Sequence, residues 1–343
     1  MLHFDCDYLE GAHPEVMRRL AETNLEQTPG YGADAHTARA RRLIQQACGL
    51  TEDASEVYFL VGGTQTNATV IDGLLRRHQG VVAADTAHIN VHEAGAIEAA
   101  GHKVLTLPAH EGKLRAADVE QYVTRFYADE TYAHMVAPGA VYISHPTELG
   151  TLYTLEELSA LSRTCRSLGL PLYVDGARLG YGLAAPGADV SLPDLARLAD
   201  VFYIGGTKVG ALMGEAVVVT SARALPHFFT LIKQHGALLA KGRLLGVQFE
   251  ALFTDGLYLR LARHAVEQAL RLRRAFEERG YRAVVDSPTN QQFFSLPNDV
   301  IDRLRHDATF EYWGPRGARE SQVRFVTSWA TRADDVSRLI SLL

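Results

Sequence analysis

Apolar residues fall into short runs through the middle of the chain, and Gly, Pro or Asp bounds most of these runs. Short apolar runs bounded in this way are typical of strands that are buried on both faces. We therefore predict seven buried strands, at Val57–Val61, Val81–Ala84, Val104–Leu107, Val141–Ser144, Leu172–Val174, Val201–Ile204 and Ala216–Thr220.

The segments between most of these runs have a different pattern, in which apolar residues recur at helical spacing. The segment Leu155–Cys165 is one example. When strands alternate with helices, each helix carries the chain back to the same edge of the sheet, so most neighbouring strands are parallel. The pattern predicts an α/β fold with a mostly parallel seven-stranded sheet flanked by helices.

The last part of the chain has another order of elements. A long helical segment from about Leu257 to Arg279 leads into shorter strands at Gln292–Ser295 and Val323–Val326, and a final helix follows. This order is typical of a smaller α+β domain. We predict a large domain over residues 1–245 and a small C-terminal domain over residues 246–343.

The composition is that of an ordinary globular protein, and the net charge indicates which kinds of binding partner are unfavourable. Among 343 residues, 34 are Lys or Arg and 40 are Asp or Glu, which gives a net charge of −6 at pH 7. A negative balance disfavours binding to nucleic acid or to an anionic membrane surface. The sequence has no basic-then-apolar leader and no run of about 18 apolar residues. We therefore expect a cytoplasmic protein with a small-molecule substrate.

The cysteines give no sign of a disulfide framework or a zinc site. Cys6, Cys48 and Cys165 are odd in number and form no C-x-x-C pair. Cys48 and Cys165 lie in apolar helical patterns, which favours a place in the core. We expect no bound metal.

The stretch from Asp175 to Lys208 carries the strongest chemical signal. The predicted strand Leu172–Val174 leads into Asp175, and the predicted strand Val201–Ile204 leads into a Gly-Gly-Thr sequence and Lys208. A lysine amine forms a Schiff base with pyridoxal phosphate, and a carboxylate keeps the pyridine nitrogen protonated so that the ring accepts electrons. Either motif alone is also common as a turn or a solvated loop. Behind two buried strands, the two together predict a pyridoxal phosphate site.

A candidate phosphate site follows the first predicted strand. The sequence Gly62–Asn67 precedes a predicted helix over Ala68–Arg77. Backbone N–H groups at a helix N-terminus carry partial positive charge, and the Thr64 hydroxyl adds a donor. A glycine turn with Thr64 as a simple N-cap would have the same geometry.

Three side chains are candidates for contacts around such a cofactor. His88 follows a predicted strand, where an imidazole stacks on an aromatic ring or moves a proton. Arg178 lies three residues after Asp175, and Arg324 lies in the predicted strand Val323–Val326. Either guanidinium has the geometry to bind a carboxylate through two hydrogen bonds.

Several motifs, taken in order, resemble those of the low-specificity L-threonine aldolases of the beta-eliminating lyase superfamily. These are pyridoxal phosphate enzymes of fold type I, the fold of aspartate aminotransferase. The resemblance extends from Gly11–Pro14 and Tyr31–Gly32 to Val323–Trp329, and its central motifs are Gly62–Asn67, His145–Tyr153, Asp175–Leu179 and Gly205–Gly210.

The resemblance implies roles for individual residues. Lys208 forms the Schiff base, Asp175 pairs with the pyridine nitrogen, and either His88 or His134 is the catalytic base. The implied cofactor-binding residues are Gly63, Thr64, Gln65, His88, Asp175, Arg178, Thr207, Lys208 and Arg243. The implied substrate-binding residues are Cys6, Tyr31, Arg178 and Arg324, and we add His92 as a candidate because it lies four residues after His88.

Two residues depart from the usual family pattern. Cys6 stands in place of a serine that contacts the substrate carboxylate, and a thiol is a weak hydrogen-bond donor. Carboxylate binding should therefore depend more on Arg178 and Arg324. His92 stands where a non-basic residue is usual, and it would lie on the same side as His88 if residues 89–97 are helical.

The activity implied by the resemblance is the retro-aldol cleavage of L-threonine, L-allo-threonine or a related β-hydroxy-α-amino acid to glycine and an aldehyde. Because Arg243 resembles a residue that reaches the phosphate of a neighbouring subunit, we expect a homodimer or homotetramer with active sites at the subunit interface. The alternatives are β-elimination or deamination of a related amino acid, and a catalytically silent regulator with the same fold.

Overall fold

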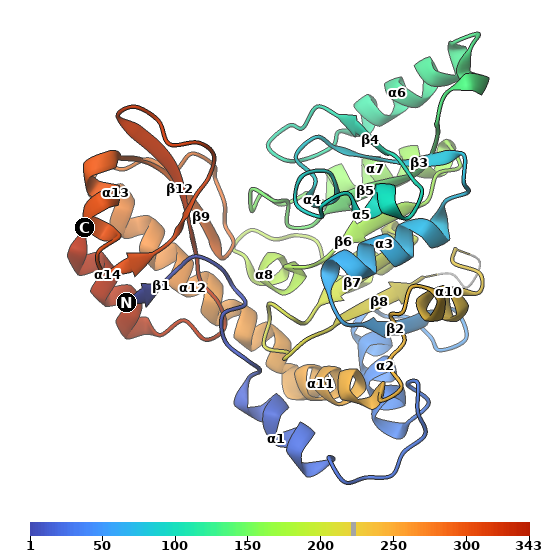
Figure 1. Ribbon diagram of the computed structural model, residues 1–343, viewed down its shortest axis with the longest axis horizontal. Coiled ribbons are helices and arrows are strands. Elements are labelled where there is room, and N and C mark those ends of the chain that lie inside the picture. The colour runs from blue at the N-terminus through green and yellow to red at the C-terminus, as the bar shows by residue number, and fades with distance from the viewer. Residues whose placement is uncertain (221–223) are drawn as a thin grey trace.

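A seven-stranded sheet forms the centre of the larger part of the molecule (Figure 1). This computed structural model describes residues 1–220 and 224–343. In space the strands follow the order β2-β8-β7-β6-β5-β3-β4. Their bounds are β2 Glu56–Leu60, β3 Gln79–Ala84, β4 Val104–Leu107, β5 Ala137–Ser144, β6 Leu172–Asp175, β7 Val201–Gly205 and β8 Glu215–Val219.

Most neighbouring strands of this sheet are parallel. The pairs β3–β4, β3–β5, β5–β6 and β6–β7 are parallel, whereas β8 is antiparallel to both β7 and β2. The predicted mostly parallel sheet is confirmed, and each predicted strand corresponds to an observed one. Because the parallel strands share a direction, their carboxyl ends meet at one edge, where open α/β sheets place their ligands.

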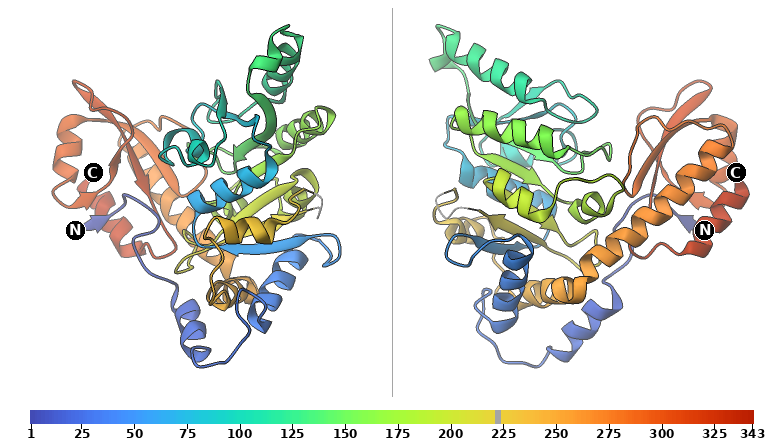
Figure 2. Two further views of the ribbon diagram at one scale, coloured as in Figure 1. Left: turned by 45° about the vertical axis from the view of Figure 1, so that its right-hand side comes forward. Right: turned by 180° about the vertical axis from the view of Figure 1, so that it is seen from behind.

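Helices cover both faces of the sheet. Helix α3 (Gly63–Leu74) and α10 (Phe228–Gln234) lie on one face, and α7 (Leu155–Ser167) and α9 (Leu192–Leu198) lie on the other (Figure 2). Helix α7 begins at Thr154 with a capping box, in which the Thr154 hydroxyl accepts from the Glu157 N–H and the Glu157 carboxylate accepts from the Thr154 N–H. The strands are therefore buried from both sides, as their continuous apolar sequences require.

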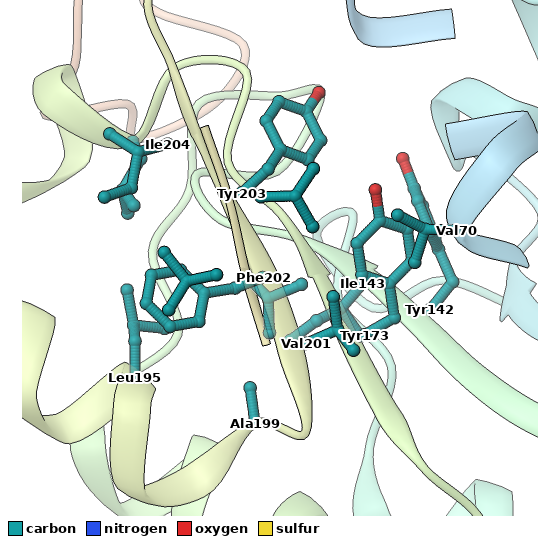
Figure 3. Close-up of a cluster of buried hydrophobic side chains, with 14 of the residues drawn as sticks. Val70, Tyr142, Ile143, Tyr173, Leu195, Ala199, Val201, Phe202, Tyr203 and Ile204 are labelled. Carbon is teal, nitrogen blue, oxygen red and sulfur yellow. The ribbon is translucent and has the colours of Figure 1, made fainter. Parts of the chain in front are cut away.

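Alternation along the strands divides the side chains between these two faces. Tyr142, Tyr173 and Tyr203 come from three adjacent strands and point their hydroxyl groups toward the same side (Figure 3). Phe202 points the other way, toward Leu195 of α9. Asp175 lies two residues after Tyr173, so strand alternation places its carboxylate on the face of the tyrosine hydroxyls.

Helix α12 (Leu257–Glu278) connects the large part of the molecule to a smaller C-terminal part (Figure 1). The smaller part contains the antiparallel sheet β11-β12-β9 and a two-stranded pair of β1 with β10. Its hydrophobic core includes Leu2 and Phe4 and resumes at Leu272 within α12. The sequence-based boundary at residue 245 therefore does not coincide with the break between the two cores.

No helix among the described residues is long and apolar enough to cross a membrane. The remaining elements complete the two parts of the molecule and the segments between them. Their bounds are β1 Leu2–His3, α1 Pro14–Glu22, α2 Ala35–Ala47, α4 His88–Val91, α5 Ala96–Ala99, α6 Ala116–Ala128, η1 Tyr132–His134, α8 Leu179–Ala184, α11 Arg243–Phe253, η2 Thr254–Gly256, β9 Gln291–Pro297, α13 Asn298–Leu304, β10 Ala308–Thr309, β11 Glu311–Tyr312, β12 Glu320–Val326 and α14 Ala333–Leu342.

Candidate active site

The structure places Asp175 and Lys208 at the same edge of the sheet. Asp175 is the last residue of β6, and Lys208 follows the end of β7, the parallel neighbour of β6. This proximity follows from the parallel pairing, because both strands end at the carboxyl edge.

Asp175 is a buried carboxylate with several hydrogen-bond donors. The Tyr142 hydroxyl and Asn67 Nδ2 donate to Asp175 Oδ2 at 2.6 and 2.9 Å, and the Ala177 N–H donates to Oδ1 at 2.9 Å. Burial raises the pKa of Asp175, but hydrogen bonds from Tyr142, Tyr203 and Ala177 outweigh burial and hold the pKa below its ordinary value. Asp175 is therefore an ionised buried carboxylate at neutral pH.

The turn that carries Lys208 is tightly packed and requires its glycines. A Cβ on Gly205 would lie 2.3 Å from the Ala177 carbonyl oxygen, and a Cβ on Gly206 would lie 2.7 Å from the Gly214 carbonyl oxygen. The Tyr181 hydroxyl also donates to the Lys208 carbonyl oxygen. Burial lowers the pKa of Lys208, and the Arg178 guanidinium lowers it further. A lowered pKa favours the neutral amine that attacks a carbonyl.

Glu215 lies beneath this turn and was not predicted from the sequence. Its Oε2 accepts from the Gly206 N–H at 3.1 Å, and its side chain is buried. Burial raises the pKa of Glu215 to about 8. Its neutral form avoids placing a second uncompensated negative charge beside Asp175.

His88 is held by a second buried carboxylate. His88 Nδ1 donates to Glu93 Oε1 at 2.8 Å, and Asn67 Nδ2 donates to the same oxygen at 2.7 Å. Burial lowers the pKa of His88, but the hydrogen bond to Glu93 and the charges of Glu148 and Asp175 raise it above its ordinary value. Asn67 thus joins Glu93 to Asp175, and neither Asn67 nor Glu93 was singled out by sequence reasoning.

The predicted phosphate site lies at the start of α3. The helix begins at Gly63 and so includes most of the Gly62–Asn67 sequence, earlier than the predicted start at Ala68. The N-cap residue Gly62 makes no side-chain capping bond, Thr64 is exposed, and Gln65 Oε1 accepts from the Val61 N–H at 3.3 Å. The first N–H groups of α3 therefore face the carboxyl edge of the sheet with a partial positive charge.

Arg178 is bound by a carboxylate that the fold brings from the N-terminus. Arg178 Nε and Nη2 donate to Asp7 at 2.8 and 3.0 Å, and Asn290 Nδ2 donates to Asp7 Oδ2 at 2.9 Å. Asp7 binds one edge of the guanidinium, through Nε and Nη2, and Nη1 takes no part in this pair, so binding of the substrate carboxylate by Arg178 stays a prediction. Cys6, next to Asp7, is buried, and burial raises the pKa of its thiol.

Arg324 approaches the site from the small domain. Its side chain is mostly buried, Nη1 donates to Gln291 Oε1 at 2.8 Å, and Nη2 forms an ion pair with Glu311. The guanidinium carbon lies 5.0 Å from the centre of the Trp313 ring. Arg324 is therefore fixed in orientation before any ligand binds.

His92 lies near His88, but the local backbone differs from the prediction. The ring centres of His92 and His88 are 5.6 Å apart, and those of His92 and Trp313 are 6.4 Å apart. Residues 89–97 do not form one helix, because α4 ends at Val91 and Ala94 has a φ of 51°. His92 is exposed and lies between the two domains.

Three predicted residues lie outside this group. His134 is exposed in η1, just before the amino end of β5, whereas the site lies at the carboxyl ends of the strands. The prediction of His134 as an alternative base is therefore wrong for this chain. Arg243 donates to the carbonyl oxygens of Thr23 and Asn24, and Tyr31 lies beside the Lys233 ammonium group, with Nζ 4.7 Å from the ring centre.

The residues that meet at the carboxyl edge fit pyridoxal phosphate. Lys208 offers an amine of lowered pKa, Asp175 offers an ionised carboxylate in a buried position, and α3 offers N–H groups for a phosphate. A Cβ on Gly62 would meet no atom within 4 Å, so the helix start is open to a ligand. These are the chemical groups that hold and tune this cofactor.

Similarity to solved structures shows which fold the chain has. A threonine aldolase from Leishmania major is 42% identical and superposes with a TM-score of 0.96, covering 100% of this chain and 98% of that chain. An aspartate aminotransferase from Thermus thermophilus is 15% identical with a TM-score of 0.70, covering 100% of this chain and 90% of that chain. The second likeness concerns the fold alone, and the predicted fold type I is confirmed.

Sequence relatives identify the family. A low specificity L-threonine aldolase from a Pseudomonas species is 31% identical, covering 98% of this chain and 95% of that protein. The family model described as beta-eliminating lyase matches residues 4–298. The chain therefore belongs to the beta-eliminating lyase family, and within that family to the low-specificity L-threonine aldolases.

Proposed function

We propose that this protein is a pyridoxal phosphate-dependent lyase that cleaves L-threonine, L-allo-threonine or a related β-hydroxy-α-amino acid to glycine and an aldehyde. The observation that carries the proposal is the placement of Lys208 and the ionised Asp175 at one edge of the sheet. The names of the Pseudomonas and Leishmania relatives support the choice of aldol cleavage over other reactions of this cofactor.

When bound, the cofactor supplies an electron sink for the pair released by Cα–Cβ cleavage. The chain holds it at four points: Lys208 by a covalent bond, Asp175 at the pyridine nitrogen, His88 at the ring, and the start of α3 at the phosphate. There Gly63, Thr64, Gln65 and Thr207 are the proposed phosphate contacts.

We propose His88 as the base that accepts the proton of the β-hydroxyl group. Its Nδ1 is occupied by Glu93, so Nε2 is the nitrogen that is available to a substrate. Its side chain is 31% exposed, while that of Glu93 is fully buried. The pair therefore orients the imidazole from inside the protein and leaves its outer nitrogen accessible.

Arg324 is the proposed partner of the substrate carboxylate. The variant Arg324→Lys should raise KM about tenfold and lower kcat less, because lysine keeps the charge but cannot form two parallel hydrogen bonds. Steady-state kinetics with L-threonine would measure both constants. Arg316→Lys, in an exposed ion pair with Asp302, is the matched control and should change neither constant. An unchanged KM for Arg324→Lys would exclude this role.

His92 is proposed to contact the β-substituent. Replacement of His92 by Asn or Phe should change the ratio of kcat/KM for L-threonine over L-allo-threonine by about fivefold, since one aromatic contact is worth on the order of 1 kcal/mol. The visible spectrum of the bound cofactor should stay the same. The same substitution at the exposed His306 is the control. A constant ratio in both His92 variants would make His92 a surface residue without influence on selectivity.

Tyr31 and Arg243 are proposed to act across a subunit interface in a cytoplasmic homodimer or homotetramer. Support comes from their position, since both lie near the N-terminal end of α11 and Tyr31 is exposed. Sedimentation of the cofactor-loaded protein would measure the number of subunits.

The rival reactions differ in their products. Aldol cleavage of L-threonine releases glycine and an aldehyde, whereas β-elimination with deamination releases ammonia and a keto acid. The retained Lys208 and Asp175 argue against a catalytically silent regulator. Product analysis with a panel of L- and D-β-hydroxy amino acids tests all three functions, and ammonia without glycine would overturn the proposal.

A further inference from the structure

One face of the small antiparallel sheet carries a group of polar side chains. Glu311 of β11 lies directly opposite Arg324 of β12, and Gln291 of β9 is a diagonal neighbour, opposite Val326. Residues on the other face, such as Phe325, pack in the core of the small domain. By strand alternation, Gln291, Arg324 and Glu311 share the face that points away from this core.

This face lies toward the active site. Trp313, which follows β11, contacts both Arg324 and His92. Asn290, next to Gln291, donates to Asp7, which in turn binds Arg178 beside Lys208. Figure 1 shows β9 and β12 on the side of α13 that faces the large domain. The face that carries Arg324 is therefore the part of the small domain that lies toward the large domain and its candidate site.

The group has buried donors without acceptors. Within residues 1–220 and 224–343, Arg324 Nε and Gln291 Nε2 are buried and have no hydrogen-bond partner. Arg324 as a residue is 8% exposed. A buried donor without a partner is costly, and a carboxylate supplies two acceptor oxygens at once. The arrangement thus favours an anion with the geometry of an α-carboxylate.

In the structure Arg324 already has a carboxylate partner, which is the side chain of Glu311. Its side chain is 42% exposed, whereas the Arg324 side chain is 10% exposed. Glu311 can therefore leave the ion pair by turning into solvent, while Arg324 stays in place between Gln291 and Trp313. An ion pair with one exposed partner contributes little stability, so an incoming carboxylate can replace it.

We propose that Glu311 is an internal carboxylate that the substrate displaces from Arg324, and that this exchange sets the affinity for amino acids. The inference rests on the proposed role of Arg324 in the aldolase reaction. If Arg324 is available only in the fraction of molecules in which Glu311 has turned away, the apparent dissociation constant is the intrinsic constant divided by that fraction. Glu311 thus tunes the affinity for the substrate carboxylate and takes no part in the chemical step.

The variant Glu311→Gln tests this exchange, because the amide keeps the shape of the side chain and removes its charge. The dissociation constant of glycine for the cofactor-loaded protein should fall about threefold to fivefold. A titration with glycine, monitored by visible absorption, would measure this constant. KM for L-threonine should fall by the same factor at unchanged kcat. The matched control is Glu320→Gln on β12, where the carboxylate accepts from the Ser295 hydroxyl, and it should leave glycine binding unchanged.

Arg324→Lys separates the failure of this proposal from the failure of the proposed carboxylate site. If Arg324→Lys weakens glycine binding while Glu311→Gln leaves it unchanged, Arg324 binds the carboxylate and the exchange is wrong. Weaker glycine binding in Glu311→Gln would show that Glu311 only orients Arg324, and would also overturn the exchange. If neither variant affects glycine binding, the role of Arg324 in the proposed function fails as well.

Discussion

Replacement of Lys208 by Ala is expected to lower turnover by more than about a thousandfold, which corresponds to roughly 4 kcal/mol of activation free energy. The lysine amine both binds the cofactor covalently and exchanges with the substrate amine. Its pKa is lowered by burial and by Arg178, so a substantial neutral fraction is present closer to neutral pH than for an exposed lysine.

The measurement combines chemical trapping with kinetics. The wild-type protein should be yellow, and reduction with borohydride should fix the cofactor on the peptide that contains Lys208. The chain has five lysines, so mapping is unambiguous. The exposed Lys103 replaced by Ala should retain both colour and turnover. Trapped cofactor on another lysine, or on none, would overturn the assignment of Lys208.

The sheet was predictable because its strands are buried on both faces and so have continuous apolar sequences. Asp175 and Lys208 were predictable for a related reason, since each follows such a strand and parallel strands end at one edge. The predicted start of helix α3 was five residues too late. Gly62 and Gly63 are weak helix formers, so the local sequence does not indicate that the helix begins at Gly63.

Contacts between residues distant in the sequence were not predictable. Asp7 binds Arg178, 171 residues away, and no local pattern indicates this pair. Glu93 and Asn67 form hydrogen bonds with each other only because α3 packs over the tyrosine face of the sheet. The one signal for Glu93 was its place five residues after His88, and a charged residue at such spacing is usually solvated.

His134 shows how a family resemblance can misplace a residue. The predicted strand began at Val141, so the distance from His134 to the edge of the sheet was undefined. The strand in fact begins at Ala137 and runs eight residues to Ser144, which separates His134 from the carboxyl edge by the length of β5. A strand of that length spans roughly 25 Å.

Asp175→Asn is expected to retain the cofactor but to lower kcat by at least about a hundredfold, or roughly 2.7 kcal/mol. An amide cannot stabilise a proton on the pyridine nitrogen, so the ring accepts electrons less readily. The structure gives a second reason for a loss of activity, which is the loss of hydrogen bonds to the side chain at position 175. The Tyr142 hydroxyl and Asn67 Nδ2 both donate to Asp175 Oδ2, and an Asn side chain has one acceptor oxygen and one donor nitrogen for these partners.

Tyr142→Phe distinguishes these two contributions to the effect of Asp175→Asn. It removes the hydrogen bond at 2.6 Å but leaves the carboxylate charge. If the charge is what activates the cofactor, Tyr142→Phe should lower kcat by only about tenfold, because a hydrogen bond to a charged group is worth roughly 1.5 kcal/mol. Cofactor content, read from visible absorption, should be near wild type in both variants. A loss of kcat below about tenfold in Asp175→Asn, with cofactor retained, would mean that Asp175 only ends a strand and that the pyridine nitrogen has another partner.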